Sequence, residues 1–260
     1  MSLSVCILAS GSSGNCTYIS SESTAILIDA GISGLAVARR LEEIGVALAS
    51  IQAVCISHEH DDHVRGVSAL HKRHPVTMYA NAGTLDALHR NPRMRTPDWQ
   101  VFTTGMSFAI GDLQIESFQV PHDAYEPVGF VVSSGSARVG IATDLGTPTA
   151  LIRERLRRCR MVIVEANHDE ALLQEAERPW NLKQRIRGRQ GHLSNTHAAS
   201  MLAEIATPDL NQVFLAHLSE DCNRRELALE AAQTSLNASG NPHVKVSVAF
   251  PDRVSEVWTG

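Results

Sequence analysis

The chain has 260 residues, of which 43% are apolar and 20% are charged, so it can bury a large core and is neither a disordered tail nor a small disulfide-stapled module. Its 23 basic and 28 acidic residues give a net charge of −5, which argues against a uniformly cationic nucleic-acid coat and against a membrane-surface binder. Twelve residues are histidine. Because neutral imidazole is the commonest transition-metal ligand, the histidines are the first candidates for a functional site.

The cysteines and the N-terminus indicate the compartment. Five cysteines, scattered and free of any CxxC pair, predict reduced thiols rather than a disulfide framework. The N-terminal residues lack a signal-peptide pattern, and no run approaches the roughly 18 apolar residues that a membrane-spanning helix needs. We therefore expect a cytoplasmic protein with no membrane association. Since no proline-rich, serine-rich or single-charge tract divides the chain, we also expect one domain over residues 1–260.

Short runs of apolar and β-branched residues recur along the chain and predict strands. They cover residues 3–8, 25–29, 53–57, 113–120, 129–134, 138–143, 161–165, 212–216 and 244–250. Helical spacing of three and four begins after Ser33 and stops at Gly45, and it returns after Asn195 and after Asn223. Because helices are few in the middle of the chain, a simple βαβ repeat fits poorly. Two mixed sheets with helices on their outer faces fit better.

The motif HEHDDH at residues 58–63 places four potential metal ligands within six residues, directly after a buried strand. These four ligands are His58, His60, Asp62 and His63. In an extended turn the side-chain period of two directs His58 and His60 the same way, whereas Asp62 and His63 lie at the start of a helix. Such an arrangement can serve two adjacent cations. The alternative, a solvated loop that happens to be rich in histidine, is disfavoured by this density of ligands.

Five further strand-like runs each lead into a ligand-type residue. These residues are Asp29, His122, Asp144, Glu165 and His217. Loops that follow strands gather at one edge of a sheet, where binding sites are commonly built. Any one of the five, taken alone, is more often a helix cap or a hydrogen-bonded core histidine. Their occurrence together beside HEHDDH predicts a metal site with several ligands.

These residues resemble the ligand set of the metallo-β-lactamase-fold hydrolases. The family's HxHxDH motif matches residues 58–63, and its later ligands match His122, Asp144 and His217. The resemblance implies a four-layer αβ/βα sandwich of the α/β class with two divalent metal ions per chain. One ion would take His58, His60 and His122, the other would take Asp62, His63 and His217, and Asp144 would bridge them. The absence of cysteine at position 144 departs from the antibiotic-hydrolysing members and argues against lactam hydrolysis.

Two details of this metal site follow from the residue types. Asp29, which matches the family's early aspartate, is expected to accept a hydrogen bond from a ligating imidazole and so to fix its tautomer. The histidine-rich ligand set favours zinc, while its carboxylates and phosphodiester chemistry permit manganese or iron. The native metal is therefore left open.

Further motifs resemble the YycJ/WalJ subfamily. They are ASGSSGN at residues 9–15, EANHD at 165–169, LKQRI at 182–186 and GHLSN at 191–195. The resemblance extends from Ser10 to His217 and implies a metal-dependent nuclease that acts on DNA from a 5′ end. Ala166 departs from the serine expected at its position, which leaves the metal ligands untouched.

A basic segment favours a phosphate-containing substrate. Residues 178–189 carry five basic side chains and no acidic one, so this segment has a charge of +5 and the remaining chain has −10. Lys183, Arg185 and Arg187 are therefore candidate phosphate contacts, since arginine binds phosphate oxygens in a bidentate manner. A solvated surface helix is the alternative.

The remaining candidate residues lie in the two glycine-containing motifs. Within the first, Ser12 and Asn15 are candidate phosphate contacts, because a glycine-rich loop can form an anion-binding nest; a simple turn is the alternative. Within the second, His192 is expected to contact phosphate or to donate a proton, with Ser194 and Asn195 as further phosphate contacts. Three other residues complete the predicted catalytic set, namely Asp62, Glu165 and His168.

The leading hypothesis is a dinuclear hydrolase that cleaves phosphodiester bonds by attack of a metal-bridging hydroxide, and we expect a 5′ to 3′ DNA exonuclease. One alternative is a hydrolase of small phosphodiesters, or of thioesters like glyoxalase II, which shares the ligand set. A second alternative is a non-catalytic, metal-stabilised binding module. It is disfavoured because the predicted ligands would leave open positions on the metals, whereas structural zinc sites are normally closed. The oligomeric state is left open.

Overall fold

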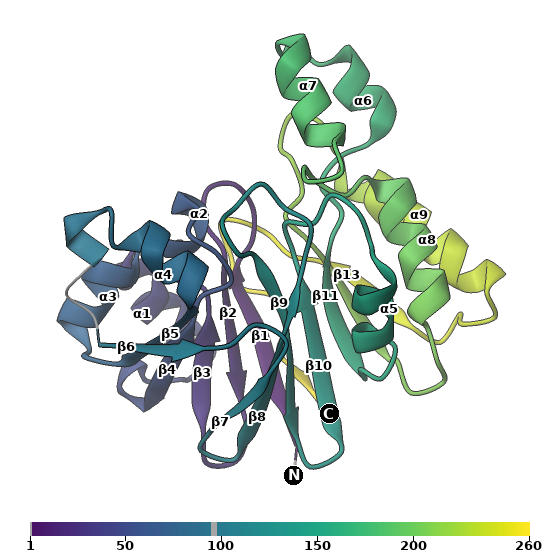
Figure 1. Cartoon of the computed structure of the whole chain (residues 1–260). Helices are drawn as coiled ribbons and strands as arrows, with labels where there is room; N and C mark the ends of the chain where they lie inside the picture. The colour runs from purple at the N-terminus through teal and green to yellow at the C-terminus, as the bar shows by residue number, and fades with distance from the viewer. Residues whose placement is uncertain (1, 95–97) are drawn as a thin grey trace.

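Two seven-stranded mixed sheets pack face to face in the computed structural model, which describes residues 2–94 and 98–260 (Figure 1). The first sheet has the order β14-β1-β2-β3-β4-β5-β6, and the second has the order β13-β12-β11-β10-β9-β8-β7. In each sheet one half is antiparallel and the other half, β3 to β6 or β10 to β13, is parallel.

The strands of the first sheet are β1 (Ser4–Ala9), β2 (Cys16–Ser20), β3 (Ala25–Ile28), β4 (Ile51–Cys55), β5 (Thr77–Asn81), β6 (Trp99–Phe102) and β14 (Trp258–Thr259). Those of the second sheet are β7 (Ser107–Ile110), β8 (Leu113–Gln119), β9 (Val128–Ser134), β10 (Ala137–Ala142), β11 (Met161–Glu165), β12 (Gln212–Ala216) and β13 (Lys245–Val248).

Helices cover the outer face of each sheet. The first sheet carries α1 (Gly34–Glu43), α2 (Asp61–Val64), α3 (Val67–Arg73) and α4 (Ala82–Leu88), with two short 3-10 turns at Leu48–Ser50 and Pro92–Met94. The second sheet carries α5 (Ala150–Leu156), α8 (Asn195–Ile205) and α9 (Arg225–Ala238). A pair of helices, α6 (Glu170–Glu175) and α7 (Trp180–Arg187), projects above the sheets at the top of Figure 1.

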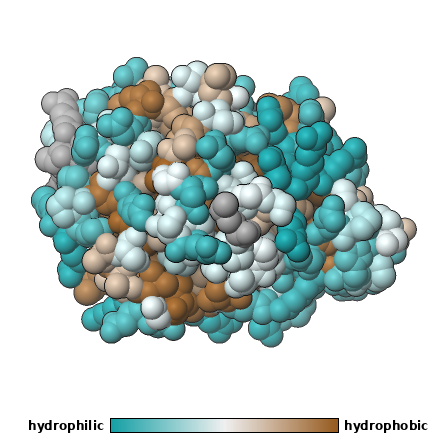
Figure 2. Space-filling model, turned by 90° about the horizontal axis from the view of Figure 1, so that it is seen from below, coloured by the Kyte–Doolittle hydropathy of each residue, from teal (hydrophilic) through white to brown (hydrophobic). Residues whose placement is uncertain are grey.

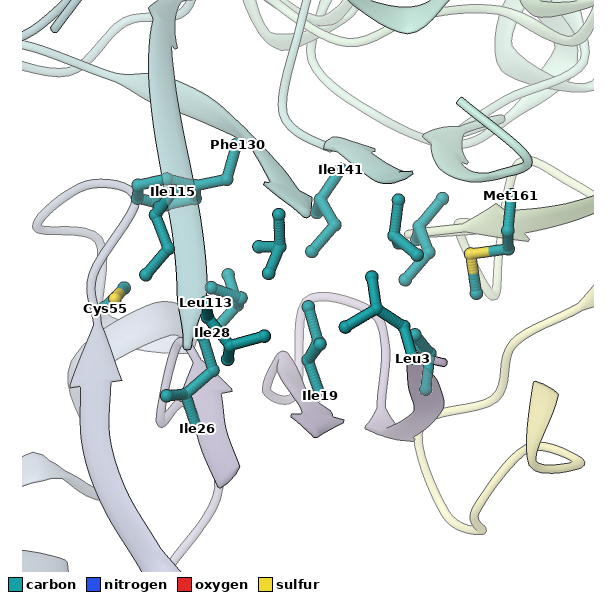
Figure 3. Packing of buried hydrophobic residues seen from close by; sticks show 14 of the residues in the cluster. Leu3, Ile19, Ile26, Ile28, Cys55, Leu113, Ile115, Phe130, Ile141 and Met161 are labelled. Atoms are coloured by element: carbon teal, nitrogen blue, oxygen red, sulfur yellow. The ribbon is translucent and has the colours of Figure 1, made fainter. Parts of the chain in front are cut away.

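The main hydrophobic core lies between the two sheets. Ile19, Ile26 and Ile28 of the first sheet face Phe130 and Ile141 of the second (Figure 3). Two further cores lie between each sheet and its own helices. Strands such as β3 are therefore buried on both faces, which explains why they read as continuous apolar runs rather than as alternating ones. The predicted four-layer α/β sandwich is confirmed.

Several elements were not predicted from the sequence. The strands β2, β5, β6, β7 and β14 are short, and β6 and β7 keep exposed residues, so their apolar signal is weak. In α9 the buried face is formed by Ala228, Ala232 and Leu236, whereas the apolar spacing in the sequence favoured Leu227, Ala231 and Leu236. The cysteines are buried and free, as expected for reduced thiols.

The two ends of the sandwich differ in character. In Figure 1 both chain termini lie at the bottom, while α2 and the α6–α7 pair lie at the top. The bottom face is a mixture of hydrophilic residues and scattered hydrophobic ones (Figure 2). Among the described helices, none is both long and apolar enough to cross a membrane. The polar cluster described next lies at the end of the strands that carries α2.

Candidate metal centre

Three residues that follow strands enter the cluster through an unusual backbone conformation. Asp29 after β3, Asp144 after β10 and His217 after β12 have φ values of 61°, 54° and 56°, and they are the described non-glycine residues with positive φ. This left-handed region costs about 1–3 kcal/mol for such residues and is typical of functional sites. It turns each side chain from the end of its strand toward a common centre.

The HEHDDH loop is held against the end of β3 by close backbone contacts. Asn15 N donates to Asp62 O at 2.7 Å, and Ala30 N donates to His63 O at 2.8 Å. A Cβ atom on Gly31 would lie only 1.6 Å from Asp62 O, so only glycine permits this approach. Helix α2 is thereby locked in place, with Asp62 and His63 in its first turn.

A first group of ligand-type side chains consists of His58, His60 and His122, whose nearest ring nitrogens lie within 4.8 Å of one another. His58 Nδ1 lies 3.0 Å from Ser57 Oγ, while its buried Nε2 has no hydrogen-bond partner among the described residues. His122 Nδ1 lies 3.1 Å from Gly191 O, and its Nε2 lies 3.3 Å from His60 Nδ1. A buried imidazole nitrogen normally has a bonding partner, and a metal ion can be the partner of His58 Nε2.

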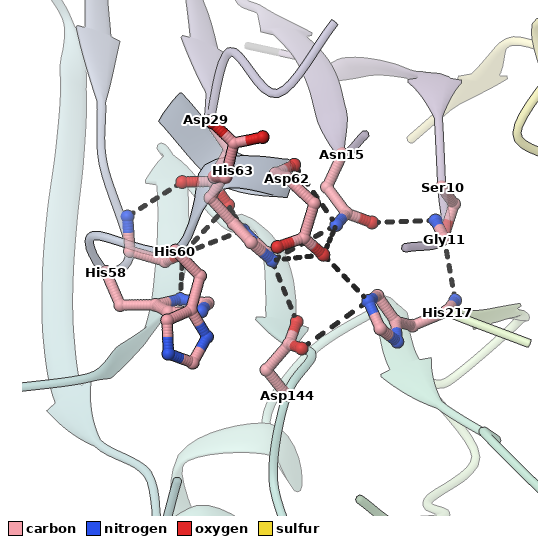
Figure 4. A network of polar contacts seen from close by, with 12 residues as sticks. Ser10, Gly11, Asn15, Asp29, His58, His60, Asp62, His63, Asp144 and His217 are labelled. Carbon is pink, nitrogen blue, oxygen red and sulfur yellow. Dashed lines mark hydrogen bonds and ion pairs between the residues drawn. The ribbon is translucent and has the colours of Figure 1, made fainter. Parts of the chain in front are cut away.

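A second group consists of Asp62, His63, Asp144 and His217, again within 4.8 Å (Figure 4). His63 Nδ1 lies 2.8 Å from Asp29 Oδ2, and its Nε2 lies 3.1 Å from Asp144 Oδ2. His217 Nε2 lies 3.3 Å from Asp62 Oδ2 and 3.5 Å from Asp144 Oδ1. His63, like His58 and His122, thus has one nitrogen held from outside the cluster and the other directed into it, which is the arrangement that metal ligation needs.

The protonation tendencies of the cluster follow from its burial and its charges. Burial alone lowers the pKa of His63 and of His217, but the nearby carboxylates outweigh it and raise both pKa values well above the usual range. Burial raises the pKa of Asp144, yet His217 and His63 outweigh it and hold that pKa well below the usual range. In His58 burial, reinforced by His63, lowers the pKa strongly. Buried carboxylates beside imidazoles form a donor set that fits divalent cations.

Glu165 and His192 form a pair at the rim of this cluster. Glu165 is fully buried, and its Oε1 lies 2.7 Å from His192 Nδ1. Its Oε2 accepts hydrogen bonds from Leu145 N and Leu193 N, both at 3.0 Å. Burial raises the pKa of Glu165, but His192 outweighs it and lowers that pKa to about 2. Conversely, burial lowers the pKa of His192, and Glu165 outweighs it and raises that pKa.

Comparison with known proteins agrees with this geometry. A family profile described as a β-lactamase superfamily domain matches residues 24–217. The chain belongs to the β-lactamase superfamily. It is 32% identical to the exodeoxyribonuclease YycJ of Bacillus anthracis over 92% of this chain and 91% of that protein. It is 33% identical to the exodeoxyribonuclease WalJ of Streptococcus pneumoniae over 94% of this chain and 91% of that protein.

These identities confirm the predicted YycJ/WalJ subfamily within the superfamily. A crystal structure of the metallo-β-lactamase fold protein YhfI from Bacillus subtilis superposes with a TM-score of 0.75 at 15% identity, covering 100% of both chains. That likeness shows the fold. As a member of this superfamily with the two His/Asp groups described above, the chain is a metal-dependent hydrolase.

In this superfamily member, four of the predicted phosphate contacts line two cavities that share His192. One, of about 170 Å³, is lined by Ser12 and Arg185 among others. The other, of about 320 Å³, is lined by Arg187 and Ser194. His168 also lines the larger cavity, so it lies beside the ligand groups and not within them.

Two of the predicted phosphate contacts have side chains that are hydrogen-bonded inside the protein. Asn15 is buried, and its Nδ2 lies 3.3 Å from Asp62 Oδ2 and 3.1 Å from His63 Nε2, so it positions these two residues. Asn195 is buried against Asn223, and each amide donates to the other at 2.8 and 2.9 Å. Both amides therefore have partners within the chain, and their contact with phosphate stays a prediction.

The basic segment is also less available than its sequence charge indicates. Arg178 pairs with Asp221 at 2.6 Å, and Arg185 pairs with Asp123 at 2.5 Å. Lys183 Nζ donates to Gln174 O at 2.6 Å and lines neither cavity. The acidic partners come from other segments of the chain, so charge counted along the sequence overstated the free positive charge.

Proposed function

We propose that the chain is a phosphodiesterase that acts on DNA as a 5′ to 3′ exonuclease with two divalent metal ions. The observation that carries this proposal is the pair of His/Asp groups sharing one edge of the sandwich, with the His192–Glu165 pair and two arginine-lined cavities beside them. The names of the similar proteins YycJ and WalJ, both exodeoxyribonucleases, support the choice of substrate.

The two groups divide the metal ligands between two ions. One ion would be held by His58, His60 and His122, the other by Asp62, His63 and His217, with Asp144 between them. Divalent ions in such a pair activate a water molecule and neutralise charge on the oxygens of a phosphodiester. Zinc fits the histidine-rich donor set best, and manganese or iron also fits.

The His192–Glu165 pair at the rim of the cluster supplies the proton that the leaving oxygen takes up. Glu165 engages Nδ1 of His192, which leaves Nε2 as the nitrogen that can face a substrate in the adjoining cavities. From there His192 Nε2 donates a proton to the oxygen that leaves the cleaved phosphodiester. Glu165 acts through His192 and stabilises its protonated form, because the Glu165 carboxylate is buried and fully hydrogen-bonded.

The substrate is tested on protein loaded with zinc or with manganese. Single- and double-stranded DNA labelled at the 5′ end, bis-p-nitrophenyl phosphate and a glutathione thioester are offered in parallel. We expect the labelled 5′ nucleotide to be released from DNA in the first cleavage, with no ladder of shortened labelled strands. Rapid hydrolysis of the thioester without cleavage of either DNA would refute the proposal.

Variants test the roles of the residues. Asp62→Ala and His63→Ala should reduce the metal content toward one ion per chain and abolish DNA cleavage, while His243→Ala, which changes an exposed histidine, should leave both unchanged. At saturating metal, Glu165→Gln should lower kcat by about 10²–10⁴-fold through the loss of proton donation. Because Glu165 Oε1 also lies 3.3 Å from Nδ1 of the ligand His217, the metal affinity of this variant should fall as well. Two ions per chain in Asp62→Ala would contradict the ligand assignment.

A further inference from the structure

The larger of the two cavities beside His192 is distinct from the metal ligands. Its volume is about 320 Å³, and it lies among Thr147, His168, Arg187, Arg189, Ser194 and His197. Apart from His192, no lining residue belongs to the two ligand groups or to a third group of described residues, formed by Asp144, Glu165, His192 and His217. The cavity therefore adjoins the metal centre and has a lining of its own.

His168 lines this cavity and carries an unmet hydrogen-bonding group. The residue is 2% exposed, and its Nδ1 is buried with no hydrogen-bond partner among residues 2–94 and 98–260. Burial lowers the pKa of His168 and outweighs the opposing charges of Glu165 and Glu170, with smaller lowering effects from His192 and Arg187. A neutral imidazole still carries one N–H donor, and a buried polar group without a partner is rare unless a ligand completes it.

Arg187 and Arg189 give the cavity two positive charges, against one carboxylate in the lining, that of Glu170. Unlike Arg178 and Arg185, neither of them forms an ion pair with a carboxylate of the described residues. Arg187 Nη1 donates only to the neutral Gln174 Oε1, at 3.2 Å. The acidic side chain in the lining, Glu170, accepts a hydrogen bond from Thr196 Oγ1 at 3.1 Å.

The cavity is also built rigidly around a helix terminus. Ser194 caps the eleven-residue helix α8, and its Oγ accepts from His197 N at 3.3 Å, so the positive end of the α8 dipole faces the lining. Thr147 Oγ1 donates to Arg189 O at 3.2 Å. A Cβ on Gly146 would lie 2.6 Å from Arg189 C, so the backbone that carries Arg189 is packed tightly against this loop.

We infer that this cavity binds a second phosphate group of the DNA strand, separate from the phosphate cleaved at the metal centre, an inference that rests on the proposed function. Two unpaired arginines, the His168 imidazole and the α8 terminus together offer the donors that a phosphate accepts. Because His192 lines the cavity and also borders the metal ligands, the bound phosphate neighbours the scissile one along the strand. Arg189, Thr147 and His197 thereby become substrate-positioning residues.

The test measures DNA binding by the metal-free chain, so that it does not depend on cleavage. Two single-stranded oligonucleotides, labelled at the 3′ end and differing only in a 5′-phosphate or a 5′-hydroxyl, are titrated by fluorescence anisotropy. The double variant Arg187→Ala/Arg189→Ala should weaken binding about tenfold or more, since hydrogen bonds to charged groups are worth about 1.5–3 kcal/mol. The slope of log K against log[salt] should become shallower by about 1.4, because each lost phosphate contact on a single strand removes about 0.7.

Arg39→Ala is the matched control, because Arg39 is an exposed arginine on α1, away from the cavity, and this variant should bind like the wild type. A loss confined to the 5′-phosphorylated strand identifies the bound group as the terminal phosphate, and an equal loss for both strands identifies an internal one. Equal affinities of the double variant and Arg39→Ala overturn the inference, as does a wild-type chain that binds neither strand. If the loss occurs but metal-loaded wild type cleaves no DNA, the proposed function fails while the phosphate site stands.

Discussion

The substitution Asp29→Asn separates the electrostatic role of Asp29 from its backbone role. Asp29 has a φ of 61°, a conformation that asparagine tolerates as well as aspartate does, so the substitution adds no backbone strain. Its Oδ1 accepts from Ser57 N at 2.8 Å, and its Oδ2 accepts from Ser57 Oγ at 2.9 Å and lies 2.8 Å from His63 Nδ1. An asparagine can keep the bond to Ser57 N with its oxygen, which leaves its NH₂ group facing His63.

This NH₂ group changes the tautomer of His63. To avoid two opposed donors, His63 Nδ1 must become an acceptor, and the ring proton moves to Nε2, the atom 3.1 Å from Asp144 Oδ2. The lone pair that pointed into the cluster is then lost. We expect the metal affinity to fall about 10–100-fold, which is the usual effect of removing such a partner. The free energy of unfolding should fall by about 1.5–3 kcal/mol, the value of a hydrogen bond to a charged group.

Both quantities are measurable on the same variant. Urea unfolding of the metal-free protein gives the stability, and competition with a chromophoric chelator gives the zinc affinity. Asp86→Asn, which changes an exposed aspartate on α4, is the control and should alter neither. A variant Asp29→Asn that binds zinc like the wild type would show that Asp29 does not determine the tautomer of His63, and would refute the reasoning.

Two further substitutions test the packing that supports the site. Gly31→Ala would bring a Cβ to 1.6 Å from Asp62 O, so we expect the free energy of unfolding in urea to fall by more than about 3 kcal/mol and zinc binding to weaken. Gly45→Ala is the control, because no atom lies within 4 Å of its Cβ. Its free energy of unfolding should fall by only about 1 kcal/mol, which reflects the positive φ of Gly45. Phe130→Ala removes a fully buried ring between the sheets and should lower the free energy of unfolding by about 3–5 kcal/mol; a loss below 1 kcal/mol would show that the core collapses around the gap.

The elements that were predicted from the sequence are those whose physical signal is local. Strands such as β3 and β11 are buried on both faces and show up as unbroken apolar runs. The HEHDDH loop and the ligand-type residues after strands were predicted for the same reason, because each lies next to the run that positions it. The edge strands β6 and β7 escaped prediction, since partial exposure and polar residues weaken their pattern.

The predictions that the sequence supports least concern side chains whose partners are distant along the chain. The sequence around Asn195 contains no sign of Asn223, which lies 28 residues later and satisfies its amide. The charge of the basic segment was likewise counted without Asp123, which pairs with Arg185 across 62 residues of chain. Sequence reasoning can therefore identify residues that are able to bind phosphate, but only the fold decides which of them are left unpaired.

The left-handed residues show how the fold and the site depend on each other. Asp29, Asp144 and His217 together carry about 3–9 kcal/mol of unfavourable backbone conformation, which is comparable to the net stability of a typical domain. Three separate cores, one between the sheets and two beneath the helices, offset this cost. Hydrogen bonds to the same residues, such as His217 N to Ser10 Oγ at 2.8 Å, hold the turns in place. The backbone strain at the three strand ends is therefore balanced by the packing of the strands that carry them, since β3, β10 and β12 are all buried in these cores.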